Sequence, residues 1–391
     1  MTEEILIVGG GASGMMCACR FAKRGFKVTV LEKSDRVGKK LLATGNGKCN
    51  LTNVNIKIED YNSDEAKWAL LRYSPKRVIS EFESMGLMTR TDSEGRVYPY
   101  CESANAVLNT FLRVMEEYGV NIVTNCVVGG MTNRDGKWTV MSSKGNYVAD
   151  KVVVATGSDA TMGFNSHNIT RSQGHKVTPI RYAIGPLLTD SVKGANGVRA
   201  KARATMYING QEVMGEKGEL LFKDNALSGI LAFRLSSALA RYRSEVNSCK
   251  VVIDFFPDKS FEEVADFLHK YCSAASPLQG MLHKAIAQNI FARTPMDRSL
   301  IMSRKKAEDI AYTCKNFEVD IKGLSDRLNS QVACGGISLD RIDMITMRSR
   351  NTKGLIFVGE CLDIDGLCGA GNLHWAWASA MAATEEYDNV K

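Results

Sequence analysis

The chain has 391 residues, more than one ordinary hydrophobic core accommodates, so two or three packed units are expected. Its net charge of +7 is mild and unclustered, which disfavours a dedicated nucleic-acid-binding domain. The 11 cysteines contain no CxxC pair and no regular framework, which disfavours a zinc site, a dithiol centre and a secreted disulfide scaffold. Neither a signal peptide nor a membrane span is apparent, so the cytoplasm is the expected location.

A strand–turn–helix–strand unit is predicted at the start of the chain. EILIVGG (4–10) has the apolar run of a buried strand, and residues 27–33 have that of a second strand. The residues between them carry an apolar stripe at helical spacing, which Gly25 closes. A parallel βαβ unit requires this order of elements.

The turn of this unit, GGGASG (9–14), fits the pattern G-x-G-x-x-G. Gly9 makes the tight turn, Gly11 lets a pyrophosphate reach the backbone, and Gly14 lets helix and strand pack closely. The helix N-terminus attracts the phosphates. Glu32, at the end of the second strand, is placed to accept hydrogen bonds from the adenosine ribose. An ordinary βα turn is the alternative.

The middle of the chain is predicted to alternate between helices and strands. Residues 58–118 are predicted mostly helical, with breaks at Pro75 and at 95–100; residues 119–128 predict a strand, and 137–157 predict a hairpin leading into a buried strand. That strand ends in small residues at 155–157, which let the chain pass close to a dinucleotide; a plain strand end is the alternative.

Residues 180–257 predict strands around one helix at 228–242, and residues 260–330 predict helices. Residues 354–360 predict a further buried strand, and a last helix is expected from about Leu373 to Tyr387. The predicted architecture is therefore discontinuous: a nucleotide-binding domain is made from both ends of the chain, with an insertion at about 180–330.

The segment GLIFVGECLDIDGLCGAGNLHWAWASA (354–380) predicts a second anion site. Its strand ends at Gly359 and Glu360, and its helix begins near Leu373 behind three loop glycines. Since the first helix N-terminus serves a pyrophosphate, this one is available to the N1/C2 carbonyl edge of a flavin. Asp363 and Asp365 could bind a metal, but ribityl contacts and loop hydrogen bonds are the simpler interpretation, and no metal is predicted.

Four segments together carry a family resemblance: GGGASGMMCA, LEKSDRVGKKLLATGNGKCNLTN, VVVATG and CGGISLDRIDMITMRSRNTKGLIFVGECLDIDGLCGAGNLHWAW. They resemble the aminoacetone-oxidase family of FAD-binding proteins, also called BaiN-like or YhiN-like flavoproteins. The resemblance implies an α/β, Rossmann-like FAD domain of the glutathione-reductase type with inserted β-rich and helical subdomains. The implied boundaries are 1–180 and 331–391 for the FAD domain, 181–258 for the β-rich insertion and 259–330 for the helical one.

The resemblance also implies which residues surround the cofactor, with the loop 38–53 running from the adenosine side towards the flavin. Lys40 faces either phosphate or solvent. His374 and Lys48 are the proton-transfer candidates; for His374, a first-turn helix residue satisfied by the backbone is the alternative, and for Cys49, a buried filler. The expected cofactor-binding residues are Gly9, Gly11, Ala12, Ser13, Gly14, Glu32, Lys33, Lys40, Leu41, Thr44, Gly45, Asn46, Gly47, Cys49, Asn50, Val127, Ala155, Thr156, Gly157, Gly359, Glu360, Asp365, Gly371, Asn372 and Leu373.

The expected function is that of an FAD-dependent oxidoreductase that transfers hydride at flavin N5 to or from a small molecule. Amine or aminoketone oxidation and NAD(P)H-dependent enone reduction both fit. No second glycine-rich βα turn occurs in 180–330, so no separate nicotinamide domain is expected. Either NADH or NADPH docks transiently as the reductant, or the substrate is the electron donor and oxygen the acceptor. A nucleic-acid partner is disfavoured and no membrane association is expected, while the oligomeric state is open. The alternatives are a flavin-dependent RNA-modifying enzyme and a non-catalytic flavin-binding protein. Two departures from the family pattern, Lys223-Asp224 for Thr-His and His374 for Gln, leave the substrate open.

Overall fold

The computed structural model describes residues 2–160, 167–190, 192–242, 244–273, 275–295 and 301–386. The chain folds into two compact units, one made of residues 1–181 and 331–391 and the other of residues 182–330. The first unit is therefore built from both ends of the chain. The predicted boundary inside the insertion, at residue 258, stays a prediction.

The first unit is organised around a seven-stranded sheet with the order β20-β21-β22-β10-β1-β2-β6. Five neighbouring strands are parallel, and their apolar runs are buried on both faces, as parallel strands require. In the central register, Val8 pairs with Val154 on one side and with Leu31 on the other. The strands are β1 (Glu4–Val8), β2 (Lys27–Leu31), β6 (Asn121–Val123), β10 (Lys151–Val154), β22 (Leu355–Phe357) and the antiparallel edge pair β20 (Ile342–Asp343) and β21 (Arg348–Ser349).

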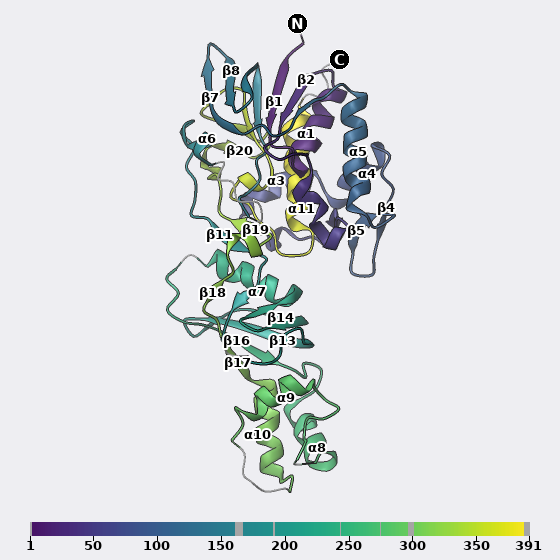
Figure 1. Ribbon diagram of the computed structural model, residues 1–391, viewed down its shortest axis with the longest axis vertical. Coiled ribbons are helices and arrows are strands. Elements are labelled where there is room, and N and C mark those ends of the chain that lie inside the picture. Colours follow the sequence, from purple (N-terminus) through teal and green to yellow (C-terminus); the bar gives the residue numbers. More distant parts are fainter. Residues whose placement is uncertain are drawn as a thin grey trace. The chain divides into compact units, whose positions relative to one another are not determined.

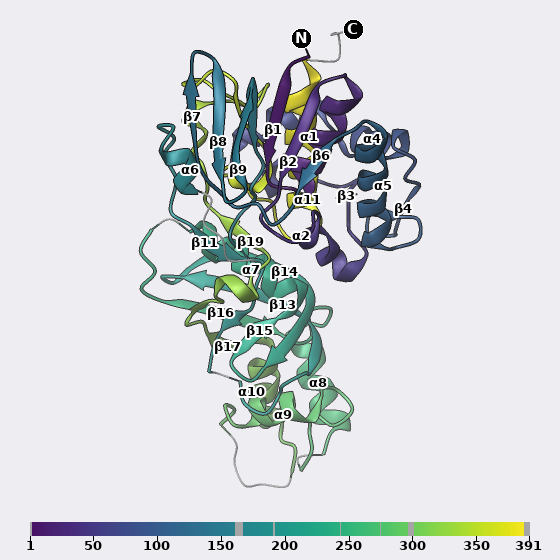
Figure 2. The ribbon, with the colours of Figure 1, turned by 45° about the horizontal axis from the view of Figure 1, so that its top comes forward.

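Helices cover one side of this sheet, and a small antiparallel sheet lies on the other (Figures 1 and 2). The helices are α1 (Ala12–Lys23), α5 (Ala104–Glu117) and α11 (Gly371–Glu385), and the small sheet is formed by β7 (Val128–Arg134), β8 (Lys137–Ser142) and β9 (Gly145–Ala149). α1 and α11 pack directly on each other: Arg20 Nε donates to Thr384 Oγ1 at 2.7 Å. The last helix of the chain is thereby fixed against the first.

Residues 58–118 are mostly helical, as predicted, with α3 (Lys67–Arg72) and α4 (Pro75–Ser84) ahead of α5. The short helix α2 (Lys39–Leu42) precedes this stretch, and the predicted break at 95–100 is a strand of an antiparallel sheet. That sheet has the order β3-β5-β4 and consists of β3 (Thr52–Asn53), β5 (Arg96–Pro99) and β4 (Thr89–Thr91). β3 pairs with β5 across more than forty residues (Thr52 with Val97), which local periodicity does not report, whereas β4 and β5 pair across a short turn.

The second unit contains a seven-stranded sheet with the order β17-β16-β13-β14-β15-β12-β18. Its strands are β12 (Leu187–Leu188), β13 (Arg199–Ile208), β14 (Gln211–Lys223), β15 (Ala226–Ser228), β16 (Cys249–Asp254), β17 (Phe317–Asp320) and β18 (Gly323–Leu324). Its helices are α7 (Gly229–Arg241), α8 (Phe261–Tyr271), α9 (Lys284–Phe291) and α10 (Arg304–Lys315). The expected helical stretch thus ends at Lys315, because Phe317 and Val319 alternate into the core as a strand does.

Gly14 is a steric requirement of the first turn. A Cβ at this position would overlap the carbonyl oxygen of Gly9, whereas a Cβ on Gly11 would have no atom within 4 Å. We expect Gly14→Ala to lower the free energy of unfolding by about 1–3 kcal/mol through overpacking. Gly11→Ala, the matched control, should change it by less than about 1 kcal/mol. Urea denaturation followed by circular dichroism measures both, and equal effects of the two substitutions would contradict the steric argument.

Candidate functional site

The glycine-rich turn after β1 brings three elements into close contact. Gly9 has φ +109°, and its amide donates to the Leu31 carbonyl at 2.9 Å. A side chain here would overlap the Ala155 carbonyl at the end of β10. Gly11 is the N-cap of α1, and no side chain of the described residues caps this helix. The amides of Ala12, Ser13 and Gly14 are therefore available to an anion in front of Gly11.

The end of β22 lies against this same helix start. Gly359 has φ +75°, and a Cβ there would approach Ser13 Oγ to 2.5 Å. Its amide donates to Ser379 Oγ at 2.9 Å, and its carbonyl accepts from Trp375 Nε1 at 3.1 Å. α11 thus holds the end of β22 at the start of α1, and the two glycine-rich ends of the chain meet in one place.

Glu32 ends β2 with both carboxylate oxygens bound to backbone. Oε2 accepts from the Gly10 amide at 2.7 Å and Oε1 from the Ser34 amide at 2.8 Å. The Cys126 amide donates to the Glu32 carbonyl at 2.8 Å, which places Val127 beside Glu32. Each carboxylate oxygen has a second lone pair, so Glu32 can still accept from a ribose hydroxyl.

A polar network joins the ends of β10 and β22 to α2. Lys40 Nζ lies 2.7 Å from Glu360 Oε2, and Ser158 Oγ donates to Glu360 Oε1 at 2.8 Å. The same oxygen accepts from the Ala333 amide at 3.2 Å. Lys40 therefore has a carboxylate partner, where the sequence left a choice between phosphate and solvent. Nearby, burial lowers the pKa of Lys33.

The loop after α2 is a tight turn with unusual backbone. Gly45, Asn46, Gly47 and Cys49 all have positive φ, and Thr44 Oγ1 donates to the Leu41 carbonyl at 2.6 Å. Asn46 and Asn50 are both expected to bind the cofactor. In the structure, Asn46 is exposed to solvent whereas Asn50 is buried.

Cys49 and Lys48, the two loop residues considered for a chemical role, are respectively buried and paired with a carboxylate. Cys49 is fully buried, and burial raises the pKa of its thiol to about 12, which agrees with the filler alternative. Lys48 lies 2.5 Å from Glu102 in an exposed ion pair. Neither arrangement supports nucleophilic or proton-transfer chemistry at this loop.

The start of α11 is the second open helix N-terminus. Its N-cap, Ala370, has φ +93°, and no described side chain caps the helix. Asn372 closes the preceding loop: its Oδ1 accepts from the Gly366 amide at 3.0 Å and its Nδ2 donates to the Gly366 carbonyl at 2.8 Å. The amides of Gly371 to Leu373 are left for a ligand.

Asp363 and the backbone of Asp365 are fixed by contacts of this loop. Asp363 Oδ2 accepts from Thr178 Oγ1 at 2.8 Å, and the Asp365 amide donates to Asn62 Oδ1 at 2.9 Å. Asp365 itself is 1% exposed. Within the part of the chain that the structure describes, no group of His, Cys, Asp or Glu side chains is placed to hold a metal ion.

His374, a candidate for proton transfer, is buried in the first turn of α11. Its side chain is fully buried, and Nδ1 lies 2.8 Å from Thr52 Oγ1. Burial lowers its pKa to about 4, an effect that the Tyr73 backbone carbonyl partly offsets. This placement favours the alternative of a structural first-turn residue that joins α11 to β3.

Four partners of the site were not anticipated from the sequence: Thr52, Tyr61, Ser158 and Ser379. Tyr61 donates its hydroxyl proton to the Gly371 carbonyl at 2.8 Å. Ser158 directly follows the Ala-Thr-Gly strand end, a signal that could have identified it. Thr52 and Ser379 lie in segments already expected to surround the cofactor, although no local pattern distinguishes these two residues. Tyr61 lies outside those segments, and only the fold brings it to the site.

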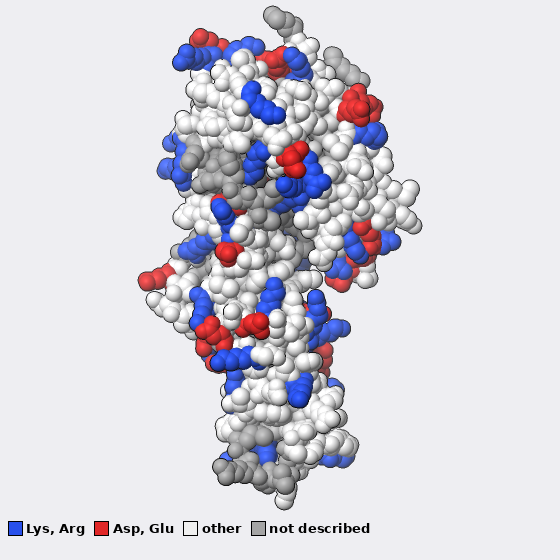
Figure 3. Space-filling view, in the orientation of Figure 1, with Lys and Arg blue, Asp and Glu red and all other residues white. Residues whose placement is uncertain are grey.

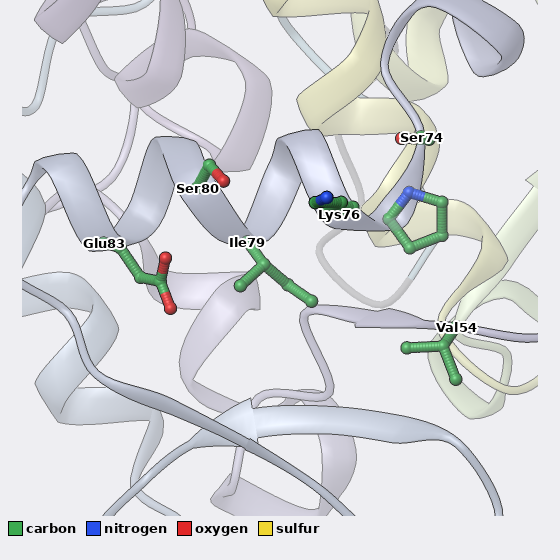
Figure 4. Close-up of a pocket in the computed structure, with 7 residues that line it drawn as sticks. Val54, Ser74, Lys76, Ile79, Ser80 and Glu83 are labelled. Atoms are coloured by element: carbon green, nitrogen blue, oxygen red, sulfur yellow. The ribbon is translucent and has the colours of Figure 1, made fainter.

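Two surface hollows lie outside these glycine-rich segments. One of about 490 Å³ follows α4, where Ile79 and Glu83 face outward with Val54 opposite (Figure 4). The other, of about 1120 Å³, is lined by residues that include Phe26, Lys151 and Arg350, at the amino-terminal edge of the parallel sheet. Basic and acidic side chains are interspersed on the face shown in Figure 3. None of the described helices has both the length and the apolarity of a membrane span.

A parallel sheet with a G-x-G-x-x-G turn, a carboxylate after its second strand and a ligand site at its carboxyl edge defines a dinucleotide-binding Rossmann protein. The model of the HI0933-like protein Rossmann domain matches residues 3–386. The chain therefore belongs to the HI0933-like family, and it is an FAD-dependent oxidoreductase, as the sequence resemblance predicts.

Similar proteins span the whole chain. A 3-dehydro-bile acid delta(4,6)-reductase of Clostridium scindens is 29% identical and covers 97% of this chain and 98% of its own. A ribosomal RNA dihydrouridine synthase of Haemophilus influenzae is 25% identical, with 97% of each chain covered. The crystal structure of a 3-ketosteroid delta1-dehydrogenase from Sterolibacterium denitrificans aligns over 100% of both chains with a TM-score of 0.52 and 12% identity, which shows a shared fold.

The buried imidazole makes stability depend on pH. Because the pKa of His374 is about 4 in the folded protein and near 6.5 when unfolded, the unfolded chain binds the extra proton first as the pH falls. We expect up to about 3 kcal/mol of stability to be lost between pH 6.5 and pH 4 through this residue. His374→Asn should remove that part of the pH dependence, whereas His269→Gln, an exposed control, should not. Denaturation curves across this range test it, and a constant difference between wild type and His374→Asn would refute it.

Proposed function

We propose that FAD binds across the carboxyl ends of β1, β10 and β22, along the start of α1 and the start of α11. The contact between Gly359 and the first turn of α1 carries this proposal, because Gly359 is also bonded to α11 and so links the two helices, which come from opposite ends of the chain. The amides of α1 would hold the pyrophosphate, in front of the unobstructed Gly11. Lys40 would supply the positive charge beside it, fixed by Glu360.

The adenosine would lie at the end of β2. Glu32 retains acceptor capacity for the ribose, and Val127 stands beside it through the Cys126–Glu32 backbone hydrogen bond. A carboxylate here disfavours a 2′-phosphate on the ribose. The flavin would then extend towards the loop 44–50 and the start of α11, where the helix N-terminus favours negative charge on the ring.

When bound, FAD supplies hydride transfer at N5, and the protein orients substrate and tunes the electrostatics. We propose that the substrate is a carbon–carbon double bond conjugated to a carbonyl. Two relatives of nearly full coverage support this class: one is named for a delta(4,6) bond of a 3-dehydro bile acid, the other for dihydrouridine, the reduced form of uridine. The buried thiols Cys49 and Cys361, whose pKa values burial raises to about 12, do not support thiol chemistry.

The electrons would come from NADH or NADPH that docks transiently. The second unit offers no parallel βαβ arrangement among its described strands, since all of its strand pairs are antiparallel. It therefore provides no separate nicotinamide domain of the Rossmann type.

RNA is the second candidate substrate, because one relative is a ribosomal RNA dihydrouridine synthase. Both candidates share the chemistry of a conjugated double bond, so the reaction class does not depend on the choice. The mild net charge of +7 favours the small molecule.

The variant Gly11→Ala separates cofactor binding from folding. Its Cβ would enter the open space in front of the α1 amides. We expect FAD affinity to fall about tenfold or more while the unfolding free energy stays nearly unchanged, since one obstructed charge-assisted hydrogen bond is worth about 1.5–3 kcal/mol. Titration of apoprotein by flavin fluorescence measures this. Release of FMN in place of FAD from the purified protein would defeat the assignment outright.

Anaerobic flavin bleaching tests the reaction class. We expect NADH or NADPH to bleach the bound flavin, and a steroid enone to restore its colour faster than a saturated ketone does. Bleaching by an aminoketone, followed by reoxidation with oxygen, would instead establish an amine oxidase. Reoxidation by a uridine-containing ribosomal RNA fragment alone would assign the RNA substrate, and reduction by dithionite only would indicate a non-catalytic flavoprotein.

A further inference from the structure

Asn50 has a buried side-chain oxygen that the protein itself does not satisfy. The residue is 8% exposed, and no described residue donates a hydrogen bond to its Oδ1. Buried polar side chains almost always have a partner, because an unpaired one pays its full desolvation cost. A donor from outside the chain is therefore expected at this oxygen.

The position of Asn50 is fixed on both sides. The Cys49 amide donates to the Thr44 carbonyl at 3.1 Å, and the Leu51 amide donates to the Val97 carbonyl at 2.8 Å. A Cβ on Gly45 would lie only 2.9 Å from the Asn50 nitrogen, so the turn closes tightly on this residue. The unpaired oxygen is thus part of a constrained turn, which a preorganised binding group requires.

Contacts that flank Asn50 place it beside α11. Trp377 Nε1 donates to the Leu51 carbonyl at 3.0 Å, and Thr52 Oγ1 lies 2.8 Å from His374 Nδ1. Both partners lie in the first two turns of the helix whose start is proposed to face the flavin. Glu32 and Val127, proposed for the adenosine, belong to the end of β2 and the chain after β6.

A primary amide offers an acceptor and a donor side by side, so its complement is an N–H next to a carbonyl. The pyrimidine edge of a flavin has this pattern, with N3–H between two carbonyl groups. We infer that Asn50 recognises the N3–H and an adjacent carbonyl of the flavin ring, and so fixes the ring in the site. This inference rests on the proposed position of FAD.

An FAD analogue methylated at N3 provides a direct test, because it lacks the donor and keeps the carbonyl groups. Apoprotein is titrated with FAD and with N3-methyl-FAD for wild type, Asn50→Ala and Asn55→Ala, an exposed control beyond the same loop. We expect methylation to weaken binding to wild type and to Asn55→Ala by about tenfold to a hundredfold, as the loss of a donor to a buried acceptor implies. For Asn50→Ala, we expect the two ligands to bind within about threefold of each other.

A second variant tests the same inference even if Asn50→Ala does not fold. Asn50→Asp keeps the shape but brings a carboxylate to the ring, which opposes the uptake of electrons. We expect the midpoint potential of its bound flavin to fall relative to wild type, as measured by dye equilibration.

The outcomes distinguish failure of the proposed role of Asn50 from failure of the proposed FAD site. Equal discrimination against N3-methyl-FAD by wild type and Asn50→Ala would overturn the role of Asn50, and so would an unchanged midpoint potential in Asn50→Asp. Tight FAD binding in either case would leave the proposed site intact. Failure of wild-type apoprotein to bind FAD at all would overturn the site itself.

Discussion

The close approach of three chain segments around the first turn is the constraint on which the first unit depends. Gly9 and Gly14 let α1 lie against β1 and the end of β10, and Gly359 lets the end of β22 reach Ser13. Any side chain at these glycines would push the elements apart. The same contacts leave the amides at the start of α1 uncovered, so the packing that forms the sheet and helix layer also forms the anion site.

The charged residues at the carboxyl edge are organised by this packing. Glu32 is held by two backbone amides, and Glu360 by Lys40, Ser158 and the Ala333 amide. Carboxylates with such partners keep a fixed orientation, which a site that must bind a flexible dinucleotide needs. The thiols of Cys49 and Cys361 and the imidazole of His374 are buried, so the chemistry falls to the cofactor and to the substrate that it meets.

The sequence was sufficient for the parts of the fold that depend on local pattern. The strands β1, β10 and β22 and the helices α1, α7 and α11 appear where apolar runs and helical spacing predict them. It failed at β17, which is a strand because its partner β16 lies far away in the chain, and at 95–100 it indicated a break but not the strand β5. The candidate site shows the same division: Gly11 and Glu32 follow from a motif with fixed spacing, while Tyr61 reaches the site only through folding.

The amino-acid sequence by itself determined the kind of cofactor site, because glycines at fixed intervals before a helix permit a backbone geometry that few other residues adopt. Tertiary structure alone decided what the individual polar side chains do. It buries His374 against Thr52, pairs Lys40 with Glu360 and leaves Asn50 without a donor. The physical reason is that burial and partnership are properties of contacts between distant segments, whereas a motif records only the backbone that a single segment can form.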